Sequence, residues 1–359
     1  MCPRIIALYL PQYHPFPEND AWWGKGFTEW TNVGKAKPLF KGHEQPKVPA
    51  DLGYYDLRIP ESRELQVEYA KRAGVEGFCY YHYWFGGKEL MERPFNEVVK
   101  LKSPDFPFCL CWANESWHNK FWNIDGNGGK KLLIEQTYIG EDDNKKHFYR
   151  LLDAFLDKRY LKQNNRLIFL IYSPLLFKDV SAFISQWNIL AKENGLNGFY
   201  FVGHTTNKDN IQKILNLGFD AVNYNRIDSC YPCKGSLDFW KAEFLRKVFN
   251  RPVVIPYNKC INKLDGIEDS YEYVCPSIIP NWDHTPRSGV NGFLFHKSTP
   301  SLFSEHVSRV LNRIKHKQNK LVFLKSWNEW GEGNYMEPDL KWGCQYIDVL
   351  KEEISKYYE

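Results

Sequence analysis

Residues 321–333 read LVFLKSWNEWGEG, a stretch in which a short apolar run gives way abruptly to polar and aromatic residues. Residues 321–325 have the nearly continuous hydrophobicity of a strand that is buried on both faces. Two tryptophans, an asparagine, two glutamates and two glycines follow within eight residues. The same succession, a buried strand and then polar groups, recurs along the chain and decides the fold that we predict.

Seven further apolar or aromatic runs have the character of this strand. They are residues 5–10, 77–83, 108–112, 167–172, 199–202, 221–224 and 274–279. Amphipathic segments, which indicate helices, separate most of these runs and close the chain. They are residues 61–73, 90–102, 143–156, 180–193, 210–217, 237–248, 302–315 and 345–357.

Alternation of strands and helices implies that the strands pair in parallel. We therefore predict an α/β fold of the (β/α)8 TIM-barrel class, with residues 1–359 as a single catalytic domain that has extended βα loops. An extra strand-like run at residues 252–257 leaves the strand count uncertain by one, so a doubly wound open sheet is the second choice. We find no internal repeat, low-complexity tract or linker that would divide the chain.

Composition narrows the class of substrate. The net charge is only +4, from 47 basic and 43 acidic residues, and no block of like charges marks a nucleic-acid or membrane surface. Aromatic residues make up 16% of the chain, more than an ordinary core requires. We expect a neutral substrate, no nucleic-acid partner, and aromatic rings that line a site.

The chain shows no targeting or spanning segment. Its first residues lack the long apolar region of a signal peptide, and no apolar run reaches the length of a membrane-spanning helix. Nine cysteines, several within apolar runs, indicate buried thiols, and Cys230-Tyr-Pro-Cys233 has no partner pair for zinc. We expect a cytoplasmic protein, and the sequence carries no signal for its oligomeric state.

In a barrel of this kind the active site is built from residues just beyond the carboxyl end of each strand. Polar and aromatic residues gather at these positions, as expected for a sugar site in which rings stack on the sugar and amides, carboxylates and imidazoles bind its hydroxyls. The candidate substrate-binding residues are Gln12, His14, Tyr81, His82, Trp84, Trp112, Asn114, Glu115, Tyr172, Tyr224, Trp282, Asp283, Trp327, Asn328 and Trp330, with Trp23 and Trp30 as a flap that excludes water. Asn328 has an alternative role as a turn residue, Glu115 as a helix cap, and Asp283 as a partner of Arg287.

The strongest catalytic candidates are Glu329 and Glu332. A spacing of three residues places both carboxyl groups on one face of a helical turn, and Gly331 and Gly333 allow a tight turn there. Glycosidic bond cleavage commonly uses two carboxyl groups, one protonated and one ionised, and two neighbouring carboxylates push their pKa values apart. The alternative, one helix cap and one solvated glutamate, fits poorly with their position between tryptophans at the end of a strand.

Four blocks of the sequence resemble a known family: YLPQYHPFPENDAWWGKGFTEWTNV (residues 9–33), CYYHYWFGG (79–87), CWANESW (111–117) and KSWNEWGEGNYMEP (325–338). They are similar to the WbsX-like glycosyltransferases of surface-polysaccharide loci, which are related to the endo-α-mannosidases of glycoside hydrolase family 99. The resemblance spans essentially the whole chain. It implies a (β/α)8 barrel that acts on glycans without a metal.

The resemblance also implies roles for the two glutamates. Asn328-Glu329-Trp330-Gly331-Glu332 matches an N-E-W-x-E segment that carries both catalytic carboxylates in family 99. Glu329 would take the proton of the substrate 2-hydroxyl to give a 1,2-anhydro sugar, and Glu332 would protonate the departing oxygen, with retention of configuration. The insertion that contains Trp22, Trp23, Phe27, Glu29 and Trp30 departs from the hydrolase pattern, which leaves the substrate open.

Other functions find less support in the residues. A nucleotide-sugar donor would call for a D-x-D or G-x-G-x-x-G motif, which the chain lacks, and the Gly126-Asn127-Gly128-Gly129 loop is typical of a lid or turn. A metal-dependent deacetylase would need His14, His82, His204, Asp283 and His284 to converge, without any local ligand spacing. We therefore expect no cofactor or metal. A non-catalytic glycan-binding module would need neither glutamate, so a glycoside hydrolase is favoured, followed by a transglycosylase or glycosyltransferase.

Overall fold

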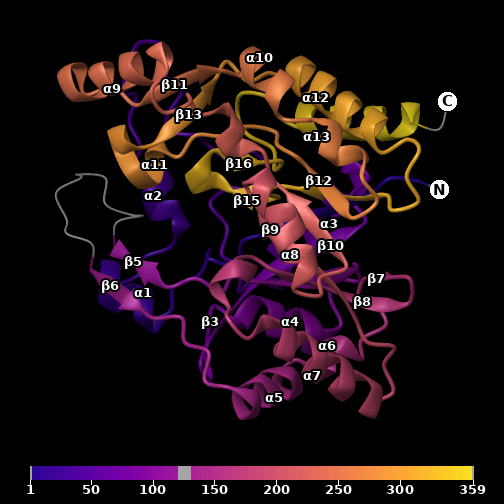
Figure 1. Cartoon of the computed structure of the whole chain (residues 1–359). Coiled ribbons are helices and arrows are strands. Elements are labelled where there is room, and N and C mark those ends of the chain that lie inside the picture. Colours follow the sequence, from indigo (N-terminus) through magenta and orange to yellow (C-terminus); the bar gives the residue numbers. More distant parts are fainter. Residues whose placement is uncertain (1, 120–130, 358–359) are drawn as a thin grey trace.

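Eight parallel strands form a closed barrel in the computed structural model, which describes residues 2–119 and 131–357 (Figure 1). Each strand pairs with the next along the chain, and β14 returns to pair with β1, where Ala7 lies opposite Leu324. The barrel strands are β1 (Arg4–Tyr9), β2 (Gly77–Phe85), β4 (Phe108–Trp112), β8 (Arg166–Ile171), β9 (Phe199–Thr205), β10 (Ala221–Tyr224), β12 (Val274–Ile278) and β14 (Leu321–Leu324). The predicted TIM barrel is confirmed.

The outer layer consists mainly of helices that follow the strands and pack on them. These helices are α3 (Pro60–Ala73), α4 (Arg93–Leu101), α5 (Glu141–Arg150), α6 (Leu152–Phe155), α7 (Val180–Glu193), α8 (Ile211–Asn216), α12 (Pro300–Arg313) and α13 (Gln345–Lys356). Their apolar stripes cover the strands, whose side chains are almost entirely buried, and one continuous core results. The predicted segment at residues 143–156 becomes two helices, α5 and α6.

Long segments after several strands build the carboxyl end of the barrel, on the left of Figure 1. They contain α1 (Pro17–Trp23), α2 (Glu29–Lys35), β3 (Lys88–Leu90), β5 (Trp117–His118), β6 (Leu132–Ile134), α11 (Thr285–Ser288), β15 (Asn328–Glu329) and β16 (Asn334–Tyr335). Within this region α2, α11 and the 3-10 turn η8 (Trp330–Glu332) pack against one another. This packing brings residues near 29, 287 and 330 together.

The extra strand-like run at residues 252–257 lies outside the barrel. It forms β11 (Val253–Pro256), which pairs with β13 (Phe293–His296) in a separate two-stranded sheet. A second apolar cluster, with Tyr257 of α10 (Tyr257–Cys260) and Phe295, packs at this sheet. The barrel therefore has eight strands, and the open-sheet alternative is excluded.

Two other predictions concern segments outside the barrel core. The predicted helix at residues 237–248 forms as α9 (Leu237–Phe249), but none of its residues is buried. The Gly126–Gly129 loop lies outside the described residues. Among the residues that are described, no helix is long and apolar enough to cross a membrane.

Candidate active site

The chain leaves β14 through a short hairpin that carries both candidate glutamates. β15 pairs with β16 in antiparallel fashion, and the turn between them contains η8. Glu329 directly precedes this 3-10 turn and Glu332 ends it, and both side chains reach the same two cations, Arg287 and Lys325. Gly333 ends the turn at a φ of 55°, in the left-handed region that favours glycine.

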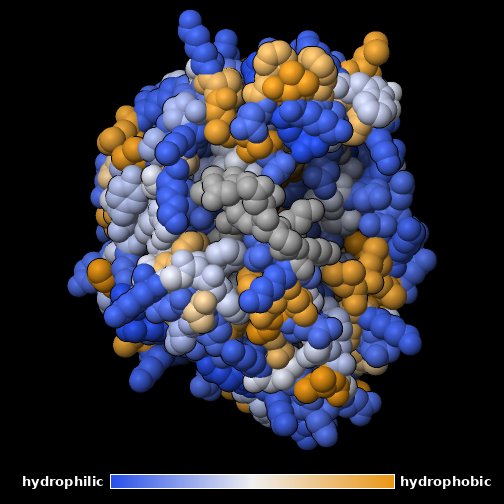
Figure 2. Space-filling model, turned by 90° about the vertical axis from the view of Figure 1, so that its left-hand side faces the viewer, coloured by the Kyte–Doolittle hydropathy of each residue, from blue (hydrophilic) through white to orange (hydrophobic). Residues whose placement is uncertain are grey.

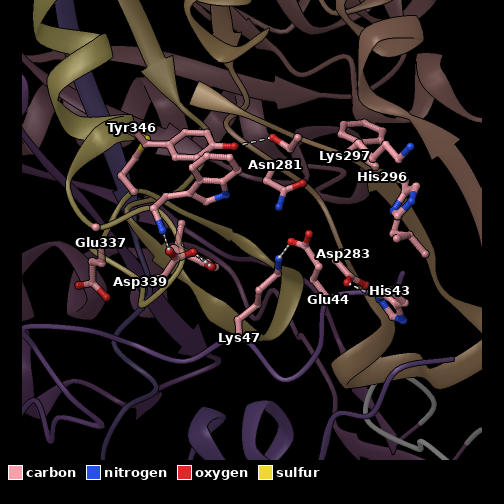
Figure 3. A pocket seen from close by; sticks show the side chains of 17 residues that line it. His43, Glu44, Lys47, Asn281, Asp283, His296, Lys297, Glu337, Asp339 and Tyr346 are labelled. Carbon is pink, nitrogen blue, oxygen red and sulfur yellow. Dashed lines mark hydrogen bonds and ion pairs between the residues drawn. The ribbon is translucent and has the colours of Figure 1, made fainter. Parts of the chain in front are cut away.

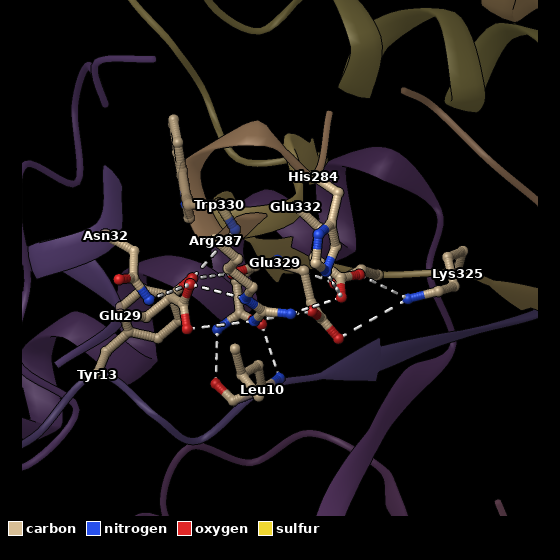
Figure 4. Close-up of polar contacts among 12 residues, drawn as sticks. Leu10, Tyr13, Glu29, Asn32, His284, Arg287, Lys325, Glu329, Trp330 and Glu332 are labelled. Carbon is tan, nitrogen blue, oxygen red and sulfur yellow. Dashed lines mark hydrogen bonds and ion pairs between the residues drawn. The ribbon is translucent and has the colours of Figure 1, made fainter. Parts of the chain in front are cut away.

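Arg287, Lys325 and His284 surround the two carboxyl groups (Figure 4). Arg287 Nη1 lies 2.5 Å from Glu332 Oε1, and Arg287 Nη2 lies 3.2 Å from Glu329 Oε2. Lys325 Nζ approaches Glu332 Oε2 at 3.3 Å and Glu329 Oε1 at 3.8 Å, while His284 Nε2 is 3.8 Å from Glu332 Oε1. Two cations thus bridge the pair, and Glu332 has the closer contacts to both.

A third carboxylate, that of Glu29, approaches Arg287 from α2. It accepts from Arg287 Nε over 2.9 Å and from Nη2 over 3.2 Å. Gly331 makes room for it, because a Cβ at that position would lie 1.6 Å from Glu29 Oε1. We expected Gly331 to serve the backbone turn. Instead, the missing side chain of Gly331 allows Glu29 and Arg287 to approach closely, whereas Gly333 allows the tight backbone turn.

The surroundings separate the pKa values of the two glutamates. Burial, followed by repulsion from Glu332, raises the pKa of Glu329 to about 7, against the opposing effect of Lys325 and Arg287. Burial also acts to raise the pKa of Glu332, but Lys325, Arg287 and His284 outweigh it and lower that pKa to about 2. Of the two carboxyl groups, Glu332 is therefore the one kept ionised, and Glu329 is the one that binds a proton more readily.

A cavity of about 270 Å³ opens above these groups. It is large enough for a sugar ring, and its walls combine aromatic rings with polar groups. Of the candidates from the sequence, the cavity is lined by Gln12, Trp23, Tyr81, Glu115, Tyr172, Glu329 and Glu332. Tyr83, Asn19, Trp117, His284, Arg287 and Lys325 also line it, although we did not predict binding roles for them.

Strand alternation explains which residues of β2 reach the cavity. Tyr81 and Tyr83 line it, while His82 and Trp84 point the other way, toward the helix layer. His82 Nε2 lies 2.7 Å from His147 Nε2 of α5, and Trp84 stacks on the same imidazole while its Nε1 donates to Asp143. Because side chains alternate along a strand, counting two residues on from Tyr81 predicts that Tyr83 also lines the cavity.

The tryptophans that follow β14 lie in the core and do not line the cavity. Trp327 packs on Phe78, and Trp330 stacks on Tyr335 with ring centroids 3.7 Å apart. Trp330 Nε1 donates to Glu337 over 2.6 Å. Asn328 binds the backbone of Leu10 through both amide atoms, at 2.8 and 3.0 Å, which favours the turn and clamp role over substrate binding.

The remaining candidates also lie outside the cavity lining. Trp30 packs on Tyr13 and Trp330, Trp112 packs among Phe177 and Phe183, and the Asn114 amide bonds to Ser173 and Tyr138. The others are His14, whose Nδ1 contacts the Pro15 carbonyl, Tyr224, which lies under Arg226, and Trp282, which stacks on His284. Their roles in binding stay predictions, and these contacts account for their burial.

Asp283 does not pair with Arg287 as its sequence neighbourhood had suggested. Its carboxylate accepts from Gln45 Nε2 and Thr285 and lies 2.8 Å from His43 Nε2. It lines a second, much smaller cavity of about 40 Å³ with Glu44, His296 and Tyr346 (Figure 3). Arg287 instead forms ion pairs with Glu29, Glu329 and Glu332. Asp283 and Arg287 are close in the sequence, but α11 turns their side chains apart.

The histidines proposed for a deacetylase do not converge. His82 pairs with His147, His204 Nδ1 lies 2.8 Å from Asn223 Oδ1, and His14 contacts its own neighbour. In the described part of the chain, no group of three or more His, Cys, Asp or Glu side chains is arranged to hold a metal ion.

The fold and the site define a (β/α)8-barrel protein with an aromatic-lined cavity and paired carboxyl groups at the carboxyl end of its strands. The chain belongs to the family described as Glycosyltransferase WbsX, whose model matches residues 5–350. It is also 34% identical over 375 residues to a protein of Xanthomonas campestris pv. campestris (strain B100) named "Uncharacterized protein WxcX", and the match covers 98% of this chain. The chain spans about half the length of this relative, of which 50% is covered.

Solved structures share the fold. The GH99 endo-alpha-mannosidase from Bacteroides thetaiotaomicron superposes with a TM-score of 0.58 at 13% sequence identity, covering 99% of this chain and 97% of that one. A protein described as "Glycoside hydrolase-like protein" gives a TM-score of 0.61 at 15% identity, covering 98% and 94% of the two chains. At these identities the likeness shows the fold of the whole chain.

Proposed function

We propose that this chain breaks or transfers an α-linked, mannoside-like glycosidic bond with retention of configuration, using Glu329 and Glu332. One observation carries the proposal: both carboxyl groups lie at the base of a cavity large enough for a sugar, with their pKa values pushed apart. A pair that shares one proton has both species that glycosidic cleavage needs, an acid and a base. Tyr81, Tyr83 and Trp117 supply aromatic surface for the sugar.

The resemblance to family 99 suggests the order of proton transfers. Glu329 takes the proton of the 2-hydroxyl, O2 attacks the anomeric carbon, and the bond to the departing oxygen breaks as Glu332 donates its proton to that oxygen. In the second half Glu332 takes a proton from water or an acceptor hydroxyl, whose oxygen opens the three-membered ring, and Glu329 returns its proton to O2. Both carboxyl groups end in the state in which they began.

The pKa values of the free protein favour the reverse distribution of roles. Glu329, at about 7, holds the proton, while Arg287 and Lys325 keep Glu332 ionised. Glu329 would then protonate the departing oxygen, and Glu332 would be the base or nucleophile. For the family order to operate, substrate has to weaken the contacts of Glu332 with these two cations.

A comparison of Glu329→Gln and Glu332→Gln on two classes of substrate decides the assignment. A panel of α-linked oligosaccharides, read by mass spectrometry, first identifies a substrate. The variants are then compared on aryl glycosides of the same sugar with a good leaving group. The variant that lacks the acid retains activity on the activated glycoside and loses it on the oligosaccharide, whereas loss of the other carboxyl abolishes both. If both variants act on both substrates like the original protein, the pair is not catalytic.

Transfer is a second candidate, favoured by the family description, which names a glycosyltransferase. Hydrolysis and transfer use the same two carboxyl groups and differ only in whether water or a sugar hydroxyl enters the second step. Adding an acceptor sugar to the reaction distinguishes them. A transferase lengthens the acceptor in preference to releasing the free sugar, and a hydrolase does not.

A further inference from the structure

α9 presents an apolar stripe to solvent at the carboxyl end of the barrel. Leu237, Trp240, Phe244 and Val248 are 89%, 62%, 57% and 59% exposed. Their spacing of three, four and four residues places all four on one face of the helix. A monomeric soluble protein rarely leaves such a row of large apolar side chains uncovered.

The other face of α9 attaches the helix to the rest of the protein. Arg246, which pairs with Glu243 within the helix, also donates to Asn291 Oδ1 over 3.1 Å, and the helix packs on β11. The Ser236 hydroxyl caps its first turn by accepting from Phe239 N. The helix is therefore held with its apolar stripe turned away from the barrel.

Lysines border the stripe. Lys241 and Lys247 lie on either side of it at the helical angle of 100° per residue, and Lys234 precedes the helix; all three are exposed. The acidic residues of α9 are Asp238 and Glu243, and Glu243 is already paired with Arg246. The exposed surface around the stripe therefore has an excess of positive charge.

We propose that α9 is a docking surface for a membrane that contains anionic lipids. Tryptophan, phenylalanine and leucine on one face with lysines at its border is the composition of helices that lie in the interfacial region of a bilayer. Lysine is depleted from protein–protein interfaces, and a second copy of this chain would bring like charges to the same border. Anionic headgroups complement the lysines, while the apolar side chains enter the acyl boundary.

The position of α9 suits this role. Figure 1 shows it at the end of the barrel where α1, α2 and α11 lie, and these elements carry the cavity residues Trp23 and Arg287 and their neighbour Glu29. Figure 2 views the molecule from this side and shows hydrophobic residues gathered at its upper edge among hydrophilic ones. A docked α9 would hold the substrate cavity close to the membrane surface.

Flotation with lipid vesicles tests the proposal. Vesicles of phosphatidylcholine alone are compared with vesicles that also contain phosphatidylglycerol. We expect the protein to float with the anionic vesicles and to be released by salt. Trp240→Glu with Phe244→Glu, and separately Lys241→Glu with Lys247→Glu, should each lower the bound fraction by about tenfold or more. These side chains are exposed, so circular dichroism and thermal unfolding should be unchanged.

Ile189→Glu on α7 is the matched control, since this residue is 57% exposed and lies on a different helix. It should bind vesicles like the original protein. Absence of binding to anionic vesicles, or binding that survives the stripe variants, would overturn the proposal. So would a dimer in analytical ultracentrifugation that Trp240→Glu with Phe244→Glu converts to a monomer, because the stripe would then be covered by a second copy.

Discussion

Arg287 donates from Nε to Glu29 Oε1 over 2.9 Å, and its other two nitrogens reach Glu332 and Glu329. Glu29 thus neutralises part of the charge that would otherwise act on the pair. We predict that Glu29→Gln lowers the pKa of Glu329, because Arg287 becomes a stronger unbalanced cation and a nearby negative charge is lost. The limb of the profile of kcat/KM against pH that Glu329 controls should move to lower pH; this is the alkaline limb if Glu329 is the acid and the acidic limb if it is the base. Activity should fall by about tenfold or more.

A suitable control for this variant is Glu268→Gln. Glu268 also pairs with an arginine, Arg226, at 2.8 Å, but it does not line the cavity. It should leave the pH profile in place. An unchanged profile for Glu29→Gln as well would show that Glu29 only fills space beside Arg287.

Protein stability should fall as pH rises through the range in which Glu329 titrates. The pKa of this buried carboxyl rises from 4.5 to about 7 in the folded protein. The folded state therefore holds a proton that the unfolded state has lost, and its contribution disappears as pH rises from about 4.5 through 7. Glu329→Gln removes this term, so its unfolding temperature should decline less steeply over that range. Equal slopes for the two proteins would contradict the raised pKa.

Gly331→Ala should disrupt the site through a single methyl group. The new Cβ would lie 1.6 Å from Glu29 Oε1 and 3.1 Å from Arg287 Nε, so both must shift. We expect a loss of about 1–3 kcal/mol in the free energy of unfolding, as for overpacking elsewhere, together with a fall in activity. Denaturant unfolding and kcat/KM measure the two effects.

The control for Gly331→Ala is Gly34→Ala in the neighbouring α2, where a Cβ meets nothing within 4 Å. It should leave the protein as stable or increase its free energy of unfolding by up to about 1 kcal/mol, because alanine lowers the entropy of the unfolded chain. Equal behaviour of both variants would mean that Gly331 is not tightly surrounded.

Neighbouring residues of β2 should respond to substitution in different ways. Tyr83 lines the cavity, so Tyr83→Phe should raise KM or lower kcat/KM with little change in stability. Trp84 donates to Asp143 behind the strand, so Trp84→Phe should cost about 1–3 kcal/mol of unfolding free energy and leave kcat/KM unchanged. Steady-state kinetics and denaturant unfolding distinguish the two. The reverse pattern would mean that β2 is turned the other way.

The barrel was predictable from the sequence because its strands are buried on both faces. Residues 108–112 and 221–224 were located to the residue, as was the helix at 180–193, since continuous apolar runs and a clean helical period leave few alternatives. α9 was located to within one residue, yet its apolar stripe faces solvent. Helical periodicity in the sequence shows which face of a helix is apolar, but it does not show what covers that face.

The place of the candidate site in the fold was predictable from the sequence. The residues that form it were predictable only in part. Position at a strand end predicts that Glu329 and Glu332 lie at the rim of the barrel, because every strand ends there, and both line the cavity. Arg287 and Glu29 come from segments far apart in the chain, and only the packing of α2 on α11 shows that they meet. Trp327 and Trp330 follow a strand but are buried beneath the cavity, because aromatic residues beside a site also form its supporting core.

The pairing of β1 with β14 has a consequence for biosynthesis. One edge of β1 stays unpaired until β14, more than three hundred residues later, has been synthesised. Likewise, Glu29 has no ion pair with Arg287 until that residue has been synthesised. During translation the emerging chain therefore exposes an unpaired strand edge and uncompensated acidic groups until its last strand leaves the ribosome. The candidate site is therefore complete only when the two distant ends of the barrel meet.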